Sequence, residues 1–207
     1  MFLILLGALT SLSLPPFNYV IINFFTLSLF YIFLIKKLRT NKNKKIFLFY
    51  GWLFGFGYFV INLYWISISL TFDNNFKFLI PVTIILIPGF LSLFYSLATY
   101  FFVIFKPKNN LSSFFSFSVI FGIIEFLRGS ILSGFPWNLI AYSFSNHLEI
   151  LSIISVIGTY SFNLFCISLF TSPALLILKK GKKEFGVLIF FFIIIFSFYF
   201  FGNQNFK

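Results

Sequence analysis

The stretch EFLRGSILSGFPWNLIAY, residues 125–142, decides how the chain is interpreted, because it places an acid and a base near the end of a long apolar run. Glu125 and Arg128 are three residues apart, a spacing that puts both on one helix face, where they can pair. Either charge alone would cost about 2.5–3.5 kcal/mol at the centre of a membrane helix. Pro136 then breaks the helix, and Trp137 is typical of a membrane–water boundary. These residues alone also fit a helix end with an interfacial anchor.

The composition of the whole chain indicates a membrane protein. Of its 207 residues, 60% are hydrophobic and only 9% are charged, whereas soluble domains carry roughly 25% charged residues. This excludes a soluble fold. We therefore predict an all-α, polytopic integral membrane protein that forms one transmembrane helical domain over residues 1–207. The 38 phenylalanines are interpreted as apolar side chains without a specific role in the membrane, because the compositional bias toward phenylalanine is too broad to mark a site.

Hydropathy and helix breakers divide the chain into about seven spans. The first is barely long enough, because a crossing usually needs about 20 residues. Proline pairs and basic loops separate several of the others. The predicted spans are residues 1–14, 17–35, 46–70, 78–105, 114–132, 148–178 and 185–201.

Basic residues predict the orientation of these spans. The loops after the second, fourth and sixth spans hold six, two and four Lys or Arg, which is twelve of the fifteen in the chain. Cytoplasmic loops are enriched in Lys and Arg, so we predict a cytoplasmic N-terminus and an outer C-terminus. Because the basic residues fall in short loops and not on one continuous face, nucleic acid is not a predicted partner.

The third span carries a small and polar stripe at helical spacing. In lipid, such stripes face other helices or a cavity. Asn62, Tyr64 and Trp65 are predicted to line an inward-facing groove at the outer end. The stripe consists of Gly51, Gly55, Tyr58, Asn62, Trp65 and Ser69.

Several motifs occur together along the chain. They are Pro-Pro-Phe after the first span, Leu63-Tyr64-Trp65-Ile66, Glu125-x-x-Arg128-Gly129, Gly134-Phe-Pro-Trp-Asn-x-x-x-Tyr142 and Ile157-Gly158-x-Tyr160. In this combination the chain resembles the membrane domain of apolipoprotein N-acyltransferases over nearly its whole length. The Glu-x-x-Arg-Gly and Gly-Phe-Pro-Trp strings are the specific part of the resemblance.

The resemblance implies a multi-pass enzyme of the bacterial inner membrane. That family moves an acyl chain from phospholipid to the α-amine of the lipid-modified N-terminal cysteine of lipoproteins, through an acyl-cysteine intermediate. Its Glu, Lys and Cys triad sits in a periplasmic nitrilase-like domain that follows the seventh span. The implied partners are phospholipid, lipoprotein and this nitrilase-like domain. No cofactor or metal is implied.

The sequence ends where the nitrilase-like domain would begin, so the chain alone is expected to be a truncated or split form without activity. Acyl transfer needs an activated nucleophile, and no catalytic residue is predicted here. Cys166 lies within an apolar run and is interpreted as a packing residue. His147 stands at a span boundary and is given no catalytic role.

The predicted topology brings several polar and aromatic residues to the same outer end. We expect them to form a platform for the lipid substrate, with Arg128 meeting a phosphate wherever Glu125 leaves it free. A small transporter remains an alternative because of the proline-broken spans and intramembrane charges, and so does a non-catalytic membrane scaffold. The platform candidates are Trp65, Glu125, Arg128, Trp137, Asn138 and Tyr142.

Overall fold

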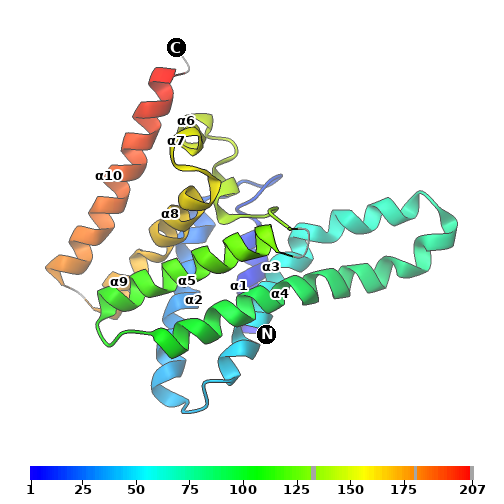
Figure 1. Ribbon diagram of the computed structural model, residues 1–207, viewed down its shortest axis with the longest axis horizontal. Helices are drawn as coiled ribbons and strands as arrows, with labels where there is room; N and C mark the ends of the chain where they lie inside the picture. The colour runs from blue at the N-terminus through cyan, green and yellow to red at the C-terminus, as the bar shows by residue number, and fades with distance from the viewer. Residues whose placement is uncertain (132–133, 180, 206–207) are drawn as a thin grey trace.

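The structure is a computed structural model that describes residues 1–131, 134–179 and 181–205. In these residues the regular elements are all helical (Figure 1). They are α1 (Phe2–Ser11), α2 (Ile21–Thr40), α3 (Ile46–Leu63), η1 (Tyr64–Thr71), η2 (Asn74–Leu79), α4 (Ile80–Phe105), α5 (Asn110–Ser130), η3 (Ile140–Phe144), α6 (Leu148–Leu151), α7 (Ile154–Ile157), α8 (Thr159–Thr171), α9 (Pro173–Leu178) and α10 (Lys182–Asn205).

Six helical segments within the described residues are long and apolar enough to cross a membrane, which confirms the predicted all-α membrane fold. Helix α1 is apolar but has only 10 residues, so the count of seven crossings stays a prediction. The predicted span 114–132 corresponds to α5, although its last residue, Leu132, lies outside the described residues. The six segments are Ile21–Thr40, Ile46–Thr71, Asn74–Phe105, Asn110–Ser130, Thr159–Leu178 and Lys182–Gln204.

The predicted span 148–178 is not one helix. Two short helices precede Gly158: α6 ends at Leu151, and α7 ends at Ile157, directly before the glycine. Helix α8 begins on its other side. Gly158 has φ +80°, a conformation that glycine adopts readily and other residues rarely do. The predicted span is therefore divided into separate helices at this turn. Hydropathy alone did not show the break, because glycine is common in membrane helices.

Glycines allow α3 to pack closely against helices on two sides. A β-carbon on Gly7 of α1 would lie 2.8 Å from the Tyr58 amide nitrogen, and one on Gly57 would lie 2.8 Å from the Ile4 carbonyl carbon. On another side, a β-carbon on Gly55 would lie 3.0 Å from Cβ of Tyr95 in α4. Close backbone approach is the usual basis of helix packing in lipid. The packing fixes the end of α3 that carries Tyr58.

An aromatic cluster fills the centre of the bundle. The rings of Phe30 and Phe54 stack with centroids 3.9 Å apart, and Phe121 meets Phe30 edge-on at 6.0 Å. Tyr95 contacts Phe121 at 5.7 Å. Because stacked and edge-on pairs stabilise beyond the burial of their area, these contacts tie α2, α3, α4 and α5 together.

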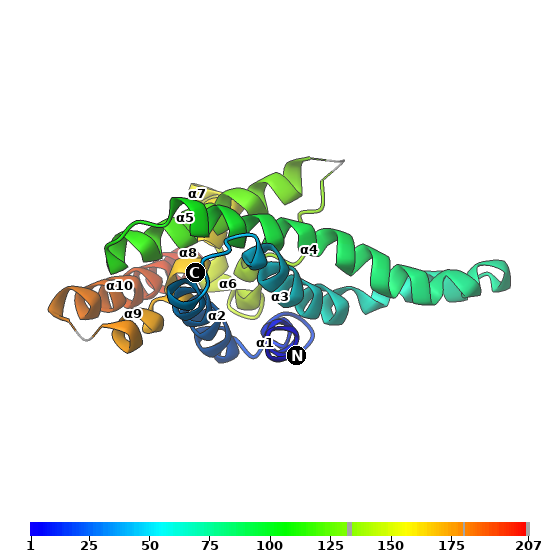
Figure 2. The same cartoon turned by 90° about the horizontal axis from the view of Figure 1, so that it is seen from below.

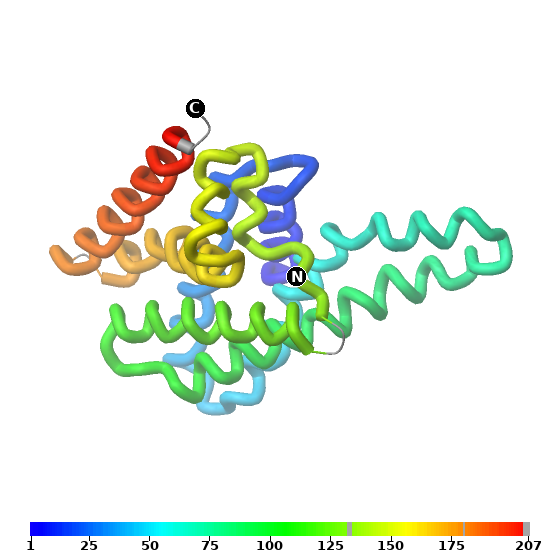
Figure 3. The backbone as a smooth tube through the Cα atoms, turned by 45° about the horizontal axis from the view of Figure 1, so that its top comes forward, coloured from blue at the N-terminus to red at the C-terminus, as the bar shows by residue number. Residues whose placement is uncertain are grey.

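A helical hairpin projects from this bundle. It consists of η1, η2 and the first half of α4, the cyan-to-green segment that extends away from the other helices in three views (Figures 1, 2 and 3). The α-helical hydrogen bonding of α3 gives way to a 3₁₀ helix at Tyr64. Large apolar side chains such as Phe72 and Phe78 are exposed on the hairpin. Its base carries Trp65 and therefore meets the end of the bundle.

The helix ends that flank the basic loops lie on one side of the molecule. They are the end of α2, the end of α4 and the start of α10, at the lower left of Figure 1. Burial lowers the pKa of the Lys106 ammonium, and the nearby positive charge of Arg39 lowers it further. Two basic loops that are far apart in sequence therefore lie close together. This arrangement agrees with the predicted orientation, which stays a prediction.

Candidate functional site

Helix α5 holds the acid–base pair at its end. The helix begins after Asn109, whose Oδ1 accepts a hydrogen bond from the Leu111 amide at 3.1 Å. Near its other end, Arg128 Nε donates to Glu125 Oε2 at 3.1 Å, and Arg128 Nη2 forms an ion pair with the same oxygen. Both side chains are buried. The predicted ion pair is confirmed.

The other edge of the Arg128 guanidinium binds backbone. Its Nη1 donates to the carbonyl oxygens of Phe135 at 2.7 Å and Trp137 at 2.9 Å. The guanidinium also lies 5.3 Å from the ring centroid of Phe59, within reach of a cation–π interaction. The side chain has no exposed surface. Each guanidinium nitrogen donates to a protein acceptor, so this arrangement lends no support to the expected contact of Arg128 with a lipid phosphate, which stays a prediction.

Residues 134–139 run without helical structure across the end of the bundle, and we call them the strap. Gly134 and Asn138 both have positive φ, +77° and +59°, and these two residue types tolerate that region best. Pro136 has no amide hydrogen to donate. The sequence of the strap thus opposes helix formation at successive positions, which leaves its carbonyl oxygens in need of other partners.

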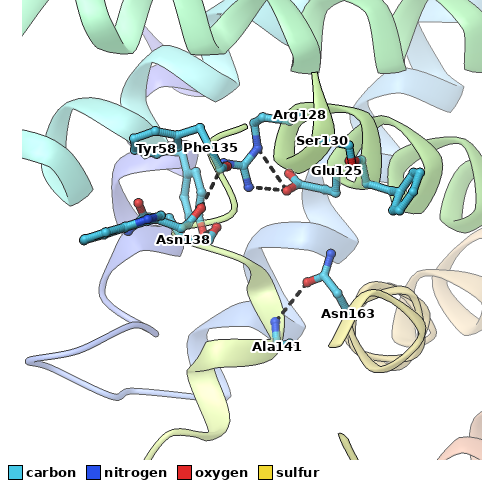
Figure 4. A network of polar contacts seen from close by, with 10 residues as sticks. Tyr58, Glu125, Arg128, Ser130, Phe135, Asn138, Ala141 and Asn163 are labelled. Carbon is cyan, nitrogen blue, oxygen red and sulfur yellow. Dashed lines mark hydrogen bonds and ion pairs between the residues drawn. The ribbon is translucent and has the colours of Figure 1, made fainter. Parts of the chain in front are cut away.

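Two further side chains hold the strap and the turn after it. The Tyr58 hydroxyl donates to the carbonyl oxygen of Asn138 at 2.8 Å (Figure 4). Asn163 Oδ1 accepts a hydrogen bond from the Ala141 amide at 3.0 Å. At the other end, the Phe135 amide donates to the Arg128 carbonyl at 2.9 Å. Helices α3, α5 and α8 therefore each contribute to the position of this segment.

The strap forms one wall of a pocket of ≈ 630 Å³. The base of the hairpin also lines the pocket. There the indoles of Trp65 and Trp137 stack with centroids 5.5 Å apart and planes at 21°. The segment at the end of α1, the end of α3 and the η3 region form the rest. The lining residues are Ser11, Leu14, Pro15, Pro16, Phe17, Ile61, Asn62, Tyr64, Trp65, Pro136, Trp137, Asn138, Tyr142 and Ser145.

The structure separates the six candidate platform residues into two groups. Trp65, Trp137, Asn138 and Tyr142 line the pocket, whereas Glu125 and Arg128 lie buried behind the strap. Burial raises the pKa of the Tyr142 phenol, Tyr160 raises it further, and Arg128 opposes the rise. Tyr142 is therefore a neutral hydroxyl at physiological pH.

Some residues of the site were not predicted from the sequence. Tyr58 belonged to the polar stripe of the third span, but nothing in that stripe showed that its hydroxyl would bind the strap. The contact of Asn163 with the turn after the strap was not predicted either. Phe17 and the prolines before it line the pocket; the Pro-Pro-Phe motif was their only signal. Cys166 is fully buried in α8 and does not line the pocket, and neither does His147.

Fold and site together define an α-helical membrane domain with an aromatic-lined pocket at one end. The family model "Apolipoprotein N-acyltransferase N-terminal domain" matches residues 6–171. The apolipoprotein N-acyltransferase of Rhodopseudomonas palustris is 37% identical over 181 residues, which are 84% of this chain and 33% of that protein. The chain therefore belongs to the apolipoprotein N-acyltransferase family.

Other relatives agree with this assignment. The apolipoprotein N-acyltransferase of Rhizobium etli is 31% identical over 203 residues, covering 93% of this chain and 38% of the relative. That of Brucella melitensis is 36% identical over 127 residues, covering 61% and 24%. The chain spans about a third of the length of these two curated relatives, from R. palustris and R. etli. The match is to the N-terminal membrane domain of the family.

Proposed function

We propose that the chain forms the membrane part of an apolipoprotein N-acyltransferase in a bacterial inner membrane, and that its pocket holds lipid during transfer of an acyl chain from phospholipid to lipoprotein. One observation carries the proposal. Trp65 and the stretch that holds Trp137, Asn138 and Tyr142 are far apart in the sequence, and they line a single pocket at one end of the bundle.

The chemistry of the pocket suits an amphiphile. Its volume of ≈ 630 Å³ lies within the range of about 300–1,000 Å³ usual for small-molecule sites. Indole and proline rings provide apolar surface for acyl chains. Asn62, Asn138 and Tyr142 supply amide and hydroxyl groups, which suit the ester and headgroup region of a lipid.

The transfer step needs an activated nucleophile and its base. Among the residues that line the pocket, none is a cysteine, lysine or glutamate, and Cys166 is enclosed in α8. We infer that a nitrilase-like domain on the periplasmic side supplies the catalytic groups, either as part of the same polypeptide or as a separate chain. In this arrangement the pocket presents the lipid and the partner domain performs the covalent chemistry.

The test supplies the nitrilase-like domain of a relative, fused after residue 207, and measures N-acylation of a diacylated lipopeptide with phospholipid as the donor. We expect the chimera to acylate, and Trp137→Ala and Asn138→Ala to reduce turnover without lowering the protein level. Trp52→Ala is the matched control, since Trp52 donates to the Gly89 carbonyl at 3.0 Å and does not line the pocket. An active chimera that is indifferent to both pocket changes would contradict the proposal.

A further inference from the structure

The contacts of Arg128 suggest a role for the ion pair beyond neutralising charge. A buried ion pair by itself adds little, because desolvation of both ions offsets their attraction, and apolar residues often replace such pairs without loss. Here Glu125 occupies only one edge of the guanidinium. The other edge donates to the carbonyl oxygens of Phe135 and Trp137, at 2.7 and 2.9 Å.

These two carbonyl oxygens belong to the strap, whose backbone has no helical hydrogen bonding. Non-helical backbone at membrane depth is tolerated only where protein or water satisfies its polar groups. Arg128 donates to two carbonyl oxygens of the strap, those of Phe135 and Trp137, and the Tyr58 hydroxyl donates to the next one, that of Asn138, at 2.8 Å. Three side-chain bonds from α5 and α3 therefore fix the backbone on both sides of the Trp137 side chain.

The position of Trp137 matters because its indole forms the pocket wall. It stacks on Trp65 at 5.5 Å, and both rings line the pocket. Trp137 is itself half-exposed, so burial of the indole does not hold it in place. The position of the indole therefore depends on the backbone of the strap, whose carbonyl oxygens accept hydrogen bonds from Arg128 and Tyr58.

We propose that Arg128 is a positioning residue for the lipid pocket, that Glu125 orients its guanidinium, and that Tyr58 is a second anchor of the same strap. This inference rests on the proposed function in one respect: it takes the ligand of the pocket to be a lipid. The geometry of the pocket wall can nevertheless be measured without any acyl transfer. The result of this test can therefore be interpreted even if the chain takes no part in acyl transfer.

The measurement is the exciton couplet in the circular dichroism spectrum of the purified chain in lipid nanodiscs. Two stacked indoles couple electronically, so Trp137→Phe and Trp65→Phe should each abolish the couplet. Trp52→Phe, which changes an indole outside the pocket, should leave it. Cys166 provides a fold control in every sample. It is the single cysteine of the chain and fully buried, so a maleimide should label it only when the bundle opens.

The decisive variant is Arg128→Lys. Lysine keeps the charge but lacks the planar fork that binds a carboxylate and two carbonyl oxygens at once. We expect the couplet to be lost while Cys166 stays protected, and Tyr58→Phe to weaken the couplet in the same way. A retained couplet in Arg128→Lys would show that the strap does not need the fork. Loss of the couplet only together with exposure of Cys166 would make Arg128 a general stabiliser of the fold.

If Arg128→Lys exposes Cys166, that variant no longer tests the position of Trp137, and Tyr58→Phe tests instead whether anchoring of the strap places this indole. Tyr58→Phe removes one hydroxyl and leaves the ion pair intact. A weakened couplet with protected Cys166 supports strap anchoring as the means of placing Trp137. An unchanged couplet in Tyr58→Phe, alongside an unfolded Arg128→Lys, overturns the proposal.

Discussion

The Tyr160 hydroxyl lies directly against the backbone of Gly129, so that a β-carbon on the glycine would overlap the hydroxyl oxygen and lie 2.8 Å from Cζ. Gly129 follows Arg128 on α5, and Tyr160 stands two residues after the Gly158 break at the start of α8. This contact joins two of the motifs that the sequence carries. It sets how closely α8 approaches the end of α5 from which the strap departs.

Gly129→Ala should therefore destabilise the protein by about 1–3 kcal/mol, the usual effect of overpacking. Gly186→Ala on α10 is the control, because a β-carbon there meets nothing within 4 Å. It should be neutral or stabilising by up to about 1 kcal/mol, since alanine favours helix over glycine. Detergent unfolding followed by circular dichroism measures both. Equal stability of the two variants would show that the Tyr160 ring moves aside freely.

Loss of either member of the ion pair should destabilise the bundle. Arg128→Ala leaves a buried carboxylate without its partner, and breaking a buried pair costs about 3–5 kcal/mol. Glu125→Gln should also destabilise, because it removes the charge that faces the guanidinium. The same unfolding assay tests both, with Arg39→Ala as a control at an exposed position. Single variants that melt like the parent would refute the importance of the pair.

The double variant Glu125→Leu/Arg128→Leu separates the pair from the strap. A buried pair without other partners can be replaced by apolar residues with little loss. Here two carbonyl oxygens would also lose their donors, at about 1–3 kcal/mol for each unsatisfied group. We therefore expect the double variant to stay clearly less stable than the parent in denaturant titrations. Recovery to parental stability would mean that water or other groups satisfy the strap.

Gly158→Ala tests a different cause of destabilisation. A β-carbon at Gly158 meets nothing within 4 Å, so no clash is expected. The strain comes from φ +80°, and a residue other than glycine held in such a region costs about 1–3 kcal/mol. Thermal melts should show a lower midpoint for Gly158→Ala. An unchanged midpoint would indicate that the α7–α8 turn can adopt another backbone conformation.

The orientation of the bundle can be tested with reporter fusions. The basic loops predict that a reporter placed after Asn41, between α2 and α3, reports a cytoplasmic position. A reporter after Asn205, at the end of α10, should report the outer side. A cytoplasmic signal at Asn205 would contradict the predicted topology and place the pocket on the wrong face for a periplasmic partner domain.

Sequence reasoning succeeded where a local rule connects residue spacing to contact. Glu125 and Arg128 were predicted to pair because three residues separate them on a helix, and the structure confirms the pair. Trp65 and Trp137 were placed at one end of the bundle by counting basic loops. The structure stacks their rings, which counting could not predict, because register between helices depends on packing that hydropathy does not encode.

The missed features share a physical cause. Arg128 and Tyr58 bind carbonyl oxygens, and a backbone acceptor leaves no residue type in the sequence to signal it. The interruption of the span 148–178 at Gly158 is similar. Glycine also serves close helix packing in membranes, as Gly55 and Gly57 do here. Its presence alone therefore does not distinguish a contact from a turn.

The way in which the strap is held also affects how the pocket can change during evolution. Every residue has a backbone carbonyl oxygen. The hydrogen bonds to the carbonyl oxygens of residues 135, 137 and 138 therefore do not depend on which side chains these residues carry. Substitutions at Trp137 can reshape the pocket wall while the attachment persists. The attachment of the segment and the shape of the pocket wall are thereby assigned to different atoms of the same residues.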